Sequence, residues 1–192
     1  MVKTENFIQV EVSSVAELRN WLENNHSQKK SIWLVTFKKE VLPKYVSIQQ
    51  VLDELLCFGW IDGIRRKLDD KRTMQLISPR QVQHWTKTYK DRFQKLEKEG
   101  RMTDAGRNAV LLSKKNGLWD FMDDVDQLIK PADFLNTLKE NPSALENFDA
   151  FGNSSIRFML RYIKIAKTAE TREKRINQIT TLAKQNIKLP GS

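Results

Sequence analysis

Cysteine and histidine are almost absent from this chain of 192 residues, which contains one cysteine, Cys57, and two histidines, His26 and His84. A single cysteine forms no internal disulfide and gives no cysteine cluster for a metal. A site built on histidine would need carboxylates from distant parts of the chain. We therefore predict neither a bound metal nor a cofactor.

Long apolar stretches are missing as well. No run approaches the roughly 20 apolar residues that a membrane-spanning helix needs. Residues 1–6 do not form the apolar core of a secretory signal. The hydrophobic fraction of 40% and the aromatic fraction of 9% are nevertheless sufficient for an ordinary folded core. These features predict a soluble globular protein of the cytoplasm, with no membrane span.

The net charge of +9 is distributed unevenly along the sequence. Residues 62–101 contain twelve basic and six acidic side chains, and residues 157–188 contain nine basic and two acidic ones. Residues 120–150, with two basic and eight acidic side chains, have the opposite charge. The two basic zones are able to attract anionic partners, and the acidic stretch is able to neutralise one of them within the folded chain.

Residues 1–118 combine helix signals with strand signals. Capping boxes at Ser14 and Ser47 precede apolar side chains at helical spacing and predict two helices. Runs rich in β-branched and aromatic residues predict strands, of which the last two form a hairpin that Pro79 ends. The expected elements are a helix at 15–25, a strand at 31–37, a helix at 48–58, hairpin strands at 61–68 and 73–78, and helices at 82–98 and 103–112.

Residues 119–192 contain helix signals only. Pro131 and Pro142 stand where the first turn of a helix tolerates proline. The expected longer helices cover residues 154–167 and 169–186. We therefore predict an α+β fold, with a small antiparallel sheet and packed helices over residues 1–118. An all-helical part over residues 119–192 follows and is expected to pack on the first part as one compact unit.

Residues 54–63, Glu-Leu-Leu-Cys-Phe-Gly-Trp-Ile-Asp-Gly, resemble the YdeI/OmpD-associated (bacteriocin-protection) family. The resemblance continues in Ser78-Pro79-Arg80, in residues 99–106 and in residues 166–176, and is weakest over residues 117–150. It implies protection against bacteriocins or cationic antimicrobial peptides, or a role under stress. It implies no settled catalytic mechanism, cofactor or active site.

The best local candidate for a site is the 62–85 region, where arginines alternate with tryptophans. Guanidinium groups grip carboxylate or phosphate groups through two parallel hydrogen bonds, and indole faces stack on bases. If Pro79 turns the chain so that Arg80 meets the first hairpin strand, an anion pocket forms there; the alternative is a solvated hairpin with two core tryptophans. The candidate ligand-binding residues of this region are Trp60, Asp62, Arg65, Arg66, Arg80 and Trp85.

Asp62 and Cys57 are the side chains of this region with acid–base or nucleophilic chemistry. Asp62 is suited to act as a general base or to clamp a ligand, and equally to pair with Arg65, Arg66 or Arg80 in a structural network. No second carboxylate is spaced to form an acid–base pair with it. Cys57 follows apolar helical residues and has no cation or histidine beside it, so we expect a buried thiol rather than a nucleophile.

Arg157 and Arg161 recur with Lys164 at helical spacing and line one helix face, together forming a second candidate binding surface. Such a stripe can follow a phosphate backbone or approach an anionic surface, or it can simply be a solvated face. No helix-turn-helix, zinc-finger or other nucleic-acid motif accompanies it.

Three functions fit these features. The first, which we favour, is a protective protein of the YdeI/OmpD-associated type that binds an anionic small molecule or a protein partner without catalysis. The second is a nucleic-acid-binding module that uses the basic zones 62–101 and 157–188. The third is an enzyme of unrecognised type that uses Asp62.

Overall fold

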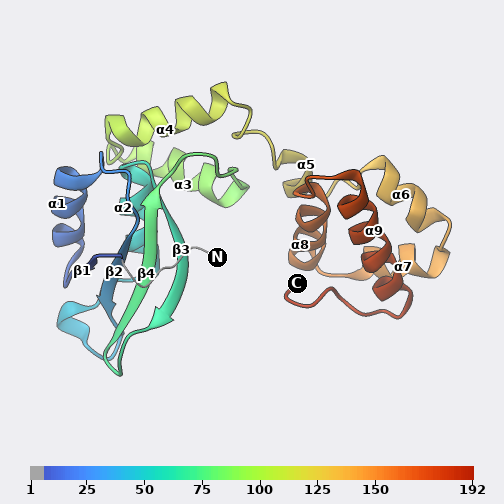
Figure 1. Ribbon diagram of the computed structural model, residues 1–192, viewed down its shortest axis with the longest axis horizontal. Coiled ribbons are helices and arrows are strands. Elements are labelled where there is room, and N and C mark those ends of the chain that lie inside the picture. The colour runs from blue at the N-terminus through green and yellow to red at the C-terminus, as the bar shows by residue number, and fades with distance from the viewer. Residues whose placement is uncertain (1–6) are drawn as a thin grey trace. The chain divides into compact units, whose positions relative to one another are not determined.

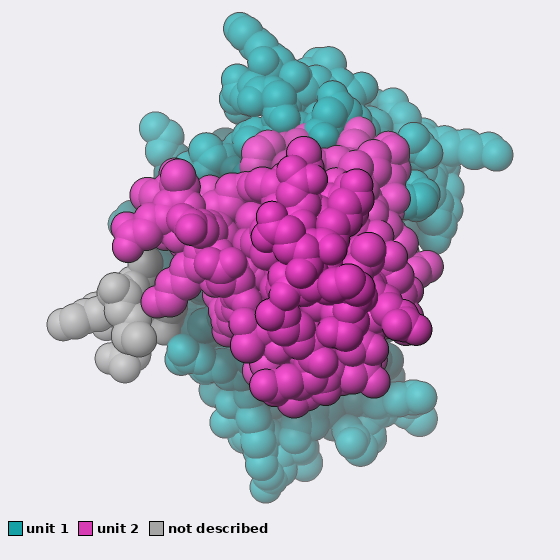
Figure 2. Space-filling model, turned by 90° about the vertical axis from the view of Figure 1, so that its right-hand side faces the viewer, with its two compact units in different colours: residues 1–120 teal, residues 121–192 magenta. Residues whose placement is uncertain are grey.

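The structure is a computed structural model that describes residues 7–192. Residues 1–6, on which the signal-segment prediction rests, lie outside the described residues. Figure 1 labels the helices and strands. The chain divides into two compact units, residues 1–120 (unit 1) and residues 121–192 (unit 2), which Figure 2 distinguishes by colour. Each unit has an apolar core of its own. That the helical part packs on the first part as one compact unit stays a prediction.

Within the described residues, unit 1 contains a four-stranded sheet with the strand order β1-β2-β4-β3. Strand β4 pairs antiparallel with both β2 and β3, so the predicted hairpin is confirmed. Strand β1 was not predicted, because three residues are too few for an alternation pattern, and it pairs parallel with β2. The sheet is therefore mixed. The strands are β1 (Gln9–Glu11), β2 (Ile32–Phe37), β3 (Trp60–Lys67) and β4 (Arg72–Pro79).

Helices α1 and α2 cover one face of this sheet (Figure 1). Each begins at a capping serine: the Ser14 side chain accepts from the backbone N–H of Glu17 at 3.1 Å, and Ser47 forms the predicted capping box with Gln50. Apolar side chains of both helices and of β2 then share one core, and each fully buried one contributes roughly 1.5–3 kcal/mol. The helices of unit 1 are α1 (Val15–Asn25), the short 3₁₀ helix η2 (Leu42–Lys44), α2 (Ile48–Cys57), α3 (Lys87–Lys98) and α4 (Asp104–Lys115).

Helix α3 begins at Lys87, later than the predicted start at residue 82. The segment before it is a loop, and Val82, which the helical periodicity had counted as part of an apolar face, is 73% exposed. Trp85 is buried instead, and its backbone N–H donates to the carbonyl of Leu118 at 3.2 Å. Tertiary burial of Trp85 therefore outweighs local helix preference here.

Unit 2 is helical throughout its regular structure, as predicted, so the α+β class with a helical C-terminal part is confirmed. Its core contains Phe134 and Phe148, whose rings meet edge to face with centroids 5.1 Å apart. Pro142 occupies the first turn of α7 as predicted, whereas Pro131 is the residue before α6. No helix within residues 7–192 is both long and apolar enough to cross a membrane. The helices are α5 (Asp123–Asp126), α6 (Ala132–Lys139), α7 (Pro142–Ala150), α8 (Asn153–Lys164) and α9 (Ala169–Lys184).

Candidate functional site

Three of the predicted site residues, Asp62, Arg80 and Trp85, lie together beside the hairpin. The Arg80 guanidinium carbon lies 4.0 Å from the ring centroid of Trp85 and 5.0 Å from that of Tyr89. The Tyr89 hydroxyl donates a hydrogen bond to the Asp62 carboxylate, whose other oxygen accepts from Gln75 Nε2 at 3.1 Å. We call these five residues the Arg80 cluster. Tyr89 and Gln75 were not predicted as site residues.

Backbone pairing places the members of this cluster. Asp62 lies opposite Ile77 in the β3–β4 ladder, and a register shift follows it in β3. Arg80 comes directly after β4, where its backbone N–H donates to the carbonyl of Gly59 at 2.8 Å. Tyr89 is in the first turn of α3. The loop from β4 to α3 thus returns the chain so that Tyr89 contacts both Asp62 and Arg80.

Arg80 is the most unusual group in the cluster, since it is only 7% exposed. Its Nη1 donates to the carbonyls of Gln83 and His84 at 3.2 and 3.5 Å. Its Nε and Nη2 are buried and have no hydrogen-bond partner among the described residues. These two N–H groups form one edge of the guanidinium and point in parallel, the geometry that grips a carboxylate or phosphate.

Arg80 is in none of the ion pairs found in the described part of the chain, and the Asp62 carboxylate of its cluster accepts from Tyr89 and Gln75 instead. Burial lowers the pKa of Arg80 to about 10, against which Tyr89 and Asp62 act in the opposite direction. Arg80 therefore still has a positive charge at neutral pH. A buried charge without a partner is unfavourable unless an anion or hydrogen-bond acceptor compensates it.

The aromatic members of the cluster add a donor but no base. Trp85 is fully buried, and its indole Nε1–H has no acceptor among residues 7–192. Burial raises the pKa of Tyr89 well above its usual range, and the hydrogen bond to Asp62 raises it further. Tyr89 therefore stays protonated and donates to Asp62. The cluster offers three buried N–H donors, two on Arg80 and one on Trp85, for an acceptor.

Arg65 and Arg66 do not belong to the cluster. Successive residues of a strand point to opposite faces of the sheet. Arg65 donates from Nη2 to the Thr73 hydroxyl at 2.9 Å, whereas the Arg66 guanidinium lies 5.3 Å from the Trp33 ring centroid. Both arginines are exposed. Beside the first hairpin strand, Arg80 therefore lies with Asp62 and Tyr89 and not with Arg65 or Arg66. The anion pocket expected there stays a prediction.

Trp60 is a core residue. It is buried, its Nε1 donates to the carbonyl of His26 at 3.0 Å, and its ring meets that of Trp21 edge to face at 5.6 Å. The hydrogen bond uses the single donor of its indole. Trp60 therefore serves the packing of unit 1.

Cys57 is expected to be unreactive in the native protein. The thiol is fully buried, and burial followed by the nearby Glu54 carboxylate raises its pKa to about 11. Only the thiolate reacts with Ellman's reagent. We expect no labelling of the native protein at mildly alkaline pH and complete labelling in denaturant. Equal rates in the two conditions would show that Cys57 is accessible.

Arg157 and Arg161 lie on α8 at helical spacing with Lys164, so the three residues share one face of that helix. Arg157 is half-buried and Arg161 is exposed. The third member, Lys164, forms an ion pair with Asp124 at 2.5 Å. The acidic stretch thus neutralises part of the late basic zone inside unit 2. Within residues 7–192, no group of three or more His, Cys, Asp or Glu side chains is placed to hold a metal ion.

Two family models match the chain. One, for a domain of unknown function (DUF8412), matches residues 10–109, which is more than half of the chain. The other, described as "Bacteriocin-protection, YdeI or OmpD-Associated", matches residues 127–186. The chain therefore belongs to the DUF8412 family, and its residues 127–186 are similar to the second family. No curated protein and no solved structure matches it.

The YdeI/OmpD-associated resemblance is thus confirmed, and its location differs from the one expected. The model of that family matches unit 2, including much of the 117–150 stretch where the sequence resemblance is weakest. Residues 54–63 and 99–106 lie in the part that the DUF8412 model matches. The Arg80 cluster therefore lies in the part of the chain that the DUF8412 model matches.

The string over residues 166–176 has a structural role in unit 2. Thr168 caps α9 by accepting from the backbone N–H of Thr171 at 3.1 Å. Arg172 of the same string holds Asp133 of α6 through two hydrogen bonds of 2.6 and 2.9 Å. Arg175 donates to the carbonyl of Tyr162 in α8 at 2.5 Å. The arginines of this string tie α9 to its neighbouring helices.

Proposed function

We propose that this protein binds a ligand with a carboxylate or phosphate group, and that Arg80 grips that group. The observation that carries the proposal is the pair of buried N–H groups on Arg80 that lack an acceptor in the described residues. An unsatisfied buried donor costs roughly 1–3 kcal/mol, and more when it is charged. An oxyanion supplies two acceptors at the spacing of this edge.

The chemistry of the neighbours favours binding over catalysis. Asp62 already accepts hydrogen bonds from Tyr89 and Gln75, and the raised pKa of Tyr89 keeps its hydroxyl protonated, so that no phenolate is available as a base. Cys57 is a buried thiol with a raised pKa. The role of Asp62 in this proposal is to orient Tyr89 against Arg80. A general base at Asp62 would need one of these donors to leave.

The basic zone around the cluster gives little support to a nucleic-acid interface. Several of its cations are paired with carboxylates, such as Arg101 with Glu54 at 2.7 Å and Lys87 with Asp91 at 2.8 Å. Arg65 and Arg66 leave the sheet on opposite faces. A duplex backbone requires several cations on one surface. A small anion at Arg80 requires one guanidinium edge.

Residues 81–84 form the loop beside Arg80, and the carbonyls of Gln83 and His84 accept from its Nη1. The two N···O distances from Nη1 are 3.2 and 3.5 Å, which are at or beyond the long end of the normal range for a hydrogen bond. The loop connects β4 with α3 and includes the exposed Val82. We propose that the ligand enters when this loop moves. If the bound carboxylate or phosphate belongs to a toxic peptide or metabolite, binding would sequester that compound. This would agree with protection, the role named in the description of the family that residues 127–186 match.

Thermal unfolding with phosphate, acetate or formate tests the proposal. A ligand that binds only the folded state raises the free energy of unfolding by mass action, by about 2.7 kcal/mol when its concentration is a hundred times Kd. The melting temperature rises as a result. We expect one of these anions to raise it above the value in chloride at equal ionic strength. Arg80→Met should abolish this rise. Arg65→Met, which removes an exposed arginine of the same hairpin, should retain it.

A second readout separates loss of binding from loss of folding. Without ligand, Arg80→Met removes an unpaired buried charge and should leave unit 1 equally stable or more stable. Arg80→Lys keeps the charge but lacks the two-pronged edge, so its response to the anions should be weaker than that of the unmutated chain. An equal anion response in Arg80→Met and Arg65→Met would refute the proposal.

A further inference from the structure

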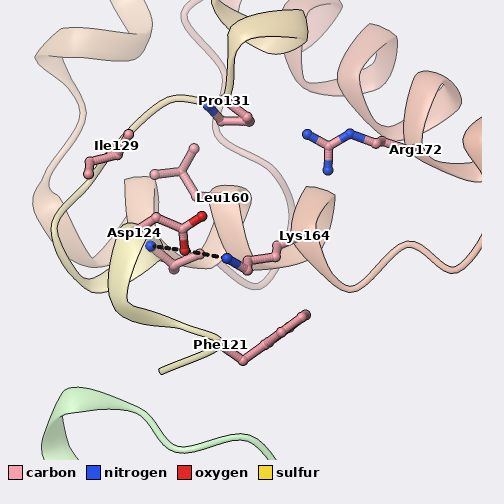
Figure 3. Close-up of a pocket in the computed structure, with 8 residues that line it drawn as sticks. Phe121, Asp124, Ile129, Pro131, Leu160, Lys164 and Arg172 are labelled. Atoms are coloured by element: carbon pink, nitrogen blue, oxygen red, sulfur yellow. Dashed lines mark hydrogen bonds and ion pairs between the residues drawn. The ribbon is translucent and has the colours of Figure 1, made fainter. Parts of the chain in front are cut away.

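Unit 2 contains a cavity of about 280 Å³ that the Arg80 cluster does not involve (Figure 3). Apolar side chains from α5, the following loop and α8 form much of its wall, among them Val125, Ile129 and Leu160. Ile129 is 53% exposed although it is large and apolar. An occupant of the cavity would cover part of this side chain and remove apolar surface from water.

Two cations and one carboxylate also line the cavity. Lys164 Nζ pairs with Asp124 Oδ1 at 2.5 Å, and the same oxygen accepts from the backbone N–H of Val125 at 2.8 Å. Figure 3 shows Lys164 reaching Asp124 and the Arg172 guanidinium extending from α9 toward the same space. The negative charge of Asp124 is therefore already committed to Lys164.

Arg172 is held in place by a carboxylate outside this cavity. Its Nε and Nη2 donate to Asp133 at 2.6 and 2.9 Å, which uses one edge of the guanidinium. Its Nη1 makes only a long contact of 3.5 Å with the carbonyl of Ile163. Asp133 thus positions Arg172, while Nη1 retains hydrogen-bonding capacity. Arg172 Nη1 and the Lys164 ammonium are therefore N–H donors in the cavity wall, which favours a ligand whose head group accepts hydrogen bonds.

We infer that this cavity binds a small monocarboxylate with an apolar body, with the carboxylate near Arg172 and Lys164 and the body against Ile129 and Leu160. Ligand sites usually measure roughly 300–1,000 Å³, so this cavity is suited to a compound of about ten non-hydrogen atoms. The inference goes beyond the proposed function, because it concerns a different unit, a different set of residues and an amphipathic ligand.

Three compounds with the same body and different head groups test the inference: phenylacetate, phenethyl alcohol and phenethylamine. Binding to the full chain is measured by NMR or calorimetry, in the Arg80→Met background, so that the acid cannot be gripped by Arg80. Charge-assisted hydrogen bonds should make phenylacetate bind roughly tenfold more tightly than the alcohol. The amine should bind least.

Substitutions at exposed isoleucines locate the binding. Ile129→Trp fills the cavity from its rim without changing a charge and should weaken phenylacetate binding by roughly tenfold or more. Ile187→Trp is the matched control, since Ile187 is also exposed in unit 2 and is not a lining residue. Undetectable phenylacetate binding, equal affinity for acid and alcohol, or equal affinity in the two variants would each overturn the inference. None of these outcomes bears on Arg80.

Discussion

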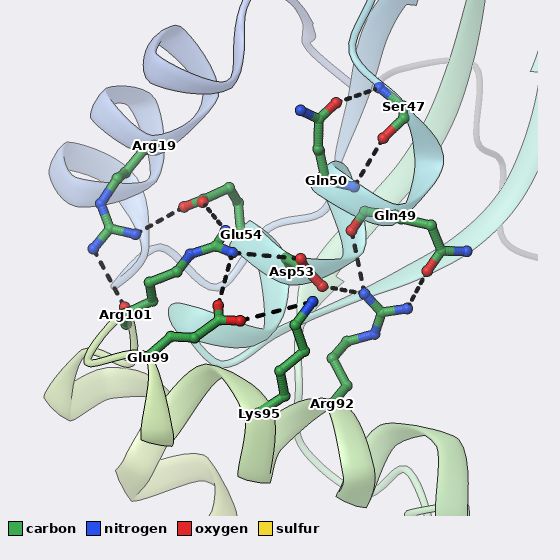
Figure 4. Close-up of polar contacts among 10 residues, drawn as sticks. All are labelled: Arg19, Ser47, Gln49, Gln50, Asp53, Glu54, Arg92, Lys95, Glu99 and Arg101. Carbon is green, nitrogen blue, oxygen red and sulfur yellow. Dashed lines mark hydrogen bonds and ion pairs between the residues drawn. The ribbon is translucent and has the colours of Figure 1, made fainter.

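Replacing Glu54 by glutamine is expected to lower the free energy of unfolding of unit 1 by about 3 kcal/mol. Glu54 is only 2% exposed, and its two oxygens accept from Arg19 Nη1 at 2.9 Å and from Arg101 Nη2 at 2.7 Å (Figure 4). Removing one member of a buried ion pair usually costs about 3–5 kcal/mol. The lower value applies here, because the side chains of both arginines are about one-third exposed and can reach water.

Denaturant unfolding followed by tryptophan fluorescence measures this loss, since all five tryptophans lie within residues 1–120. The matched control is Glu97→Gln. Its carboxylate pairs with Arg107 at 3.0 Å, but both side chains are about 40% exposed. Exposed pairs contribute about 0–1 kcal/mol. If the two variants lose the same free energy of unfolding, the ion pairs of Glu54 with Arg19 and Arg101 contribute no more than an exposed pair.

Two of the strings that carry the resemblance in unit 1, residues 54–63 and 99–106, contact each other. Glu54 pairs with Arg101, and the Thr103 hydroxyl donates to the carbonyl of Cys57 at 2.6 Å. Thr103 also caps α4 by accepting from the backbone N–H of Gly106 at 3.4 Å. Much of the side-chain pattern in these strings therefore serves the packing of α4 against the end of α2.

The elements that the sequence predicted well are those with local signals. The capping serines Ser14 and Ser47 mark the starts of α1 and α2, and the hairpin follows from two strand-like runs around a charged turn. Only Ser47 completes its predicted capping box, because the Glu17 carboxylate accepts from the backbone N–H of Ser13 and not of Ser14. Helix α3 was predicted to start too early, because burial of Trp85 depends on its contacts with α3 and with Trp119. Those contacts join segments that are distant in sequence.

The candidate site was predicted only in part, because some of its contacts also join segments that are distant in sequence. Asp62, Arg80 and Trp85 lie within one short stretch of sequence, so their proximity could be inferred. Strand alternation could have separated Arg65 from Arg66, and it could also have placed Gln75 on the face of Ile77. The contact of Tyr89 with Asp62 depends on how α3 packs against the sheet, for which the sequence contains no direct signal.

Replacing Gly106 by alanine is expected to destabilise unit 1 by about 3 kcal/mol through overpacking. A Cβ atom at this position would overlap the carbonyl oxygen of Cys57 and would lie 2.6 Å from Met102 Cε and 2.8 Å from the Cys57 carbonyl carbon. Alanine has a higher helix propensity than glycine by about 1 kcal/mol, which offsets only part of this loss. Chemical denaturation with tryptophan fluorescence again provides the measurement.

Asn108→Ala is the control in the same helix, because Asn108 is exposed and should tolerate alanine without loss. Equal stability of the two variants would mean that α4 can move away from Cys57 without penalty. We expect such movement to be costly, since it would also disturb the Thr103 hydrogen bond and the Glu54–Arg101 pair. The combined Gly106→Ala and Glu54→Gln variant should therefore lose less than the sum of the single losses, because both changes act on one interface.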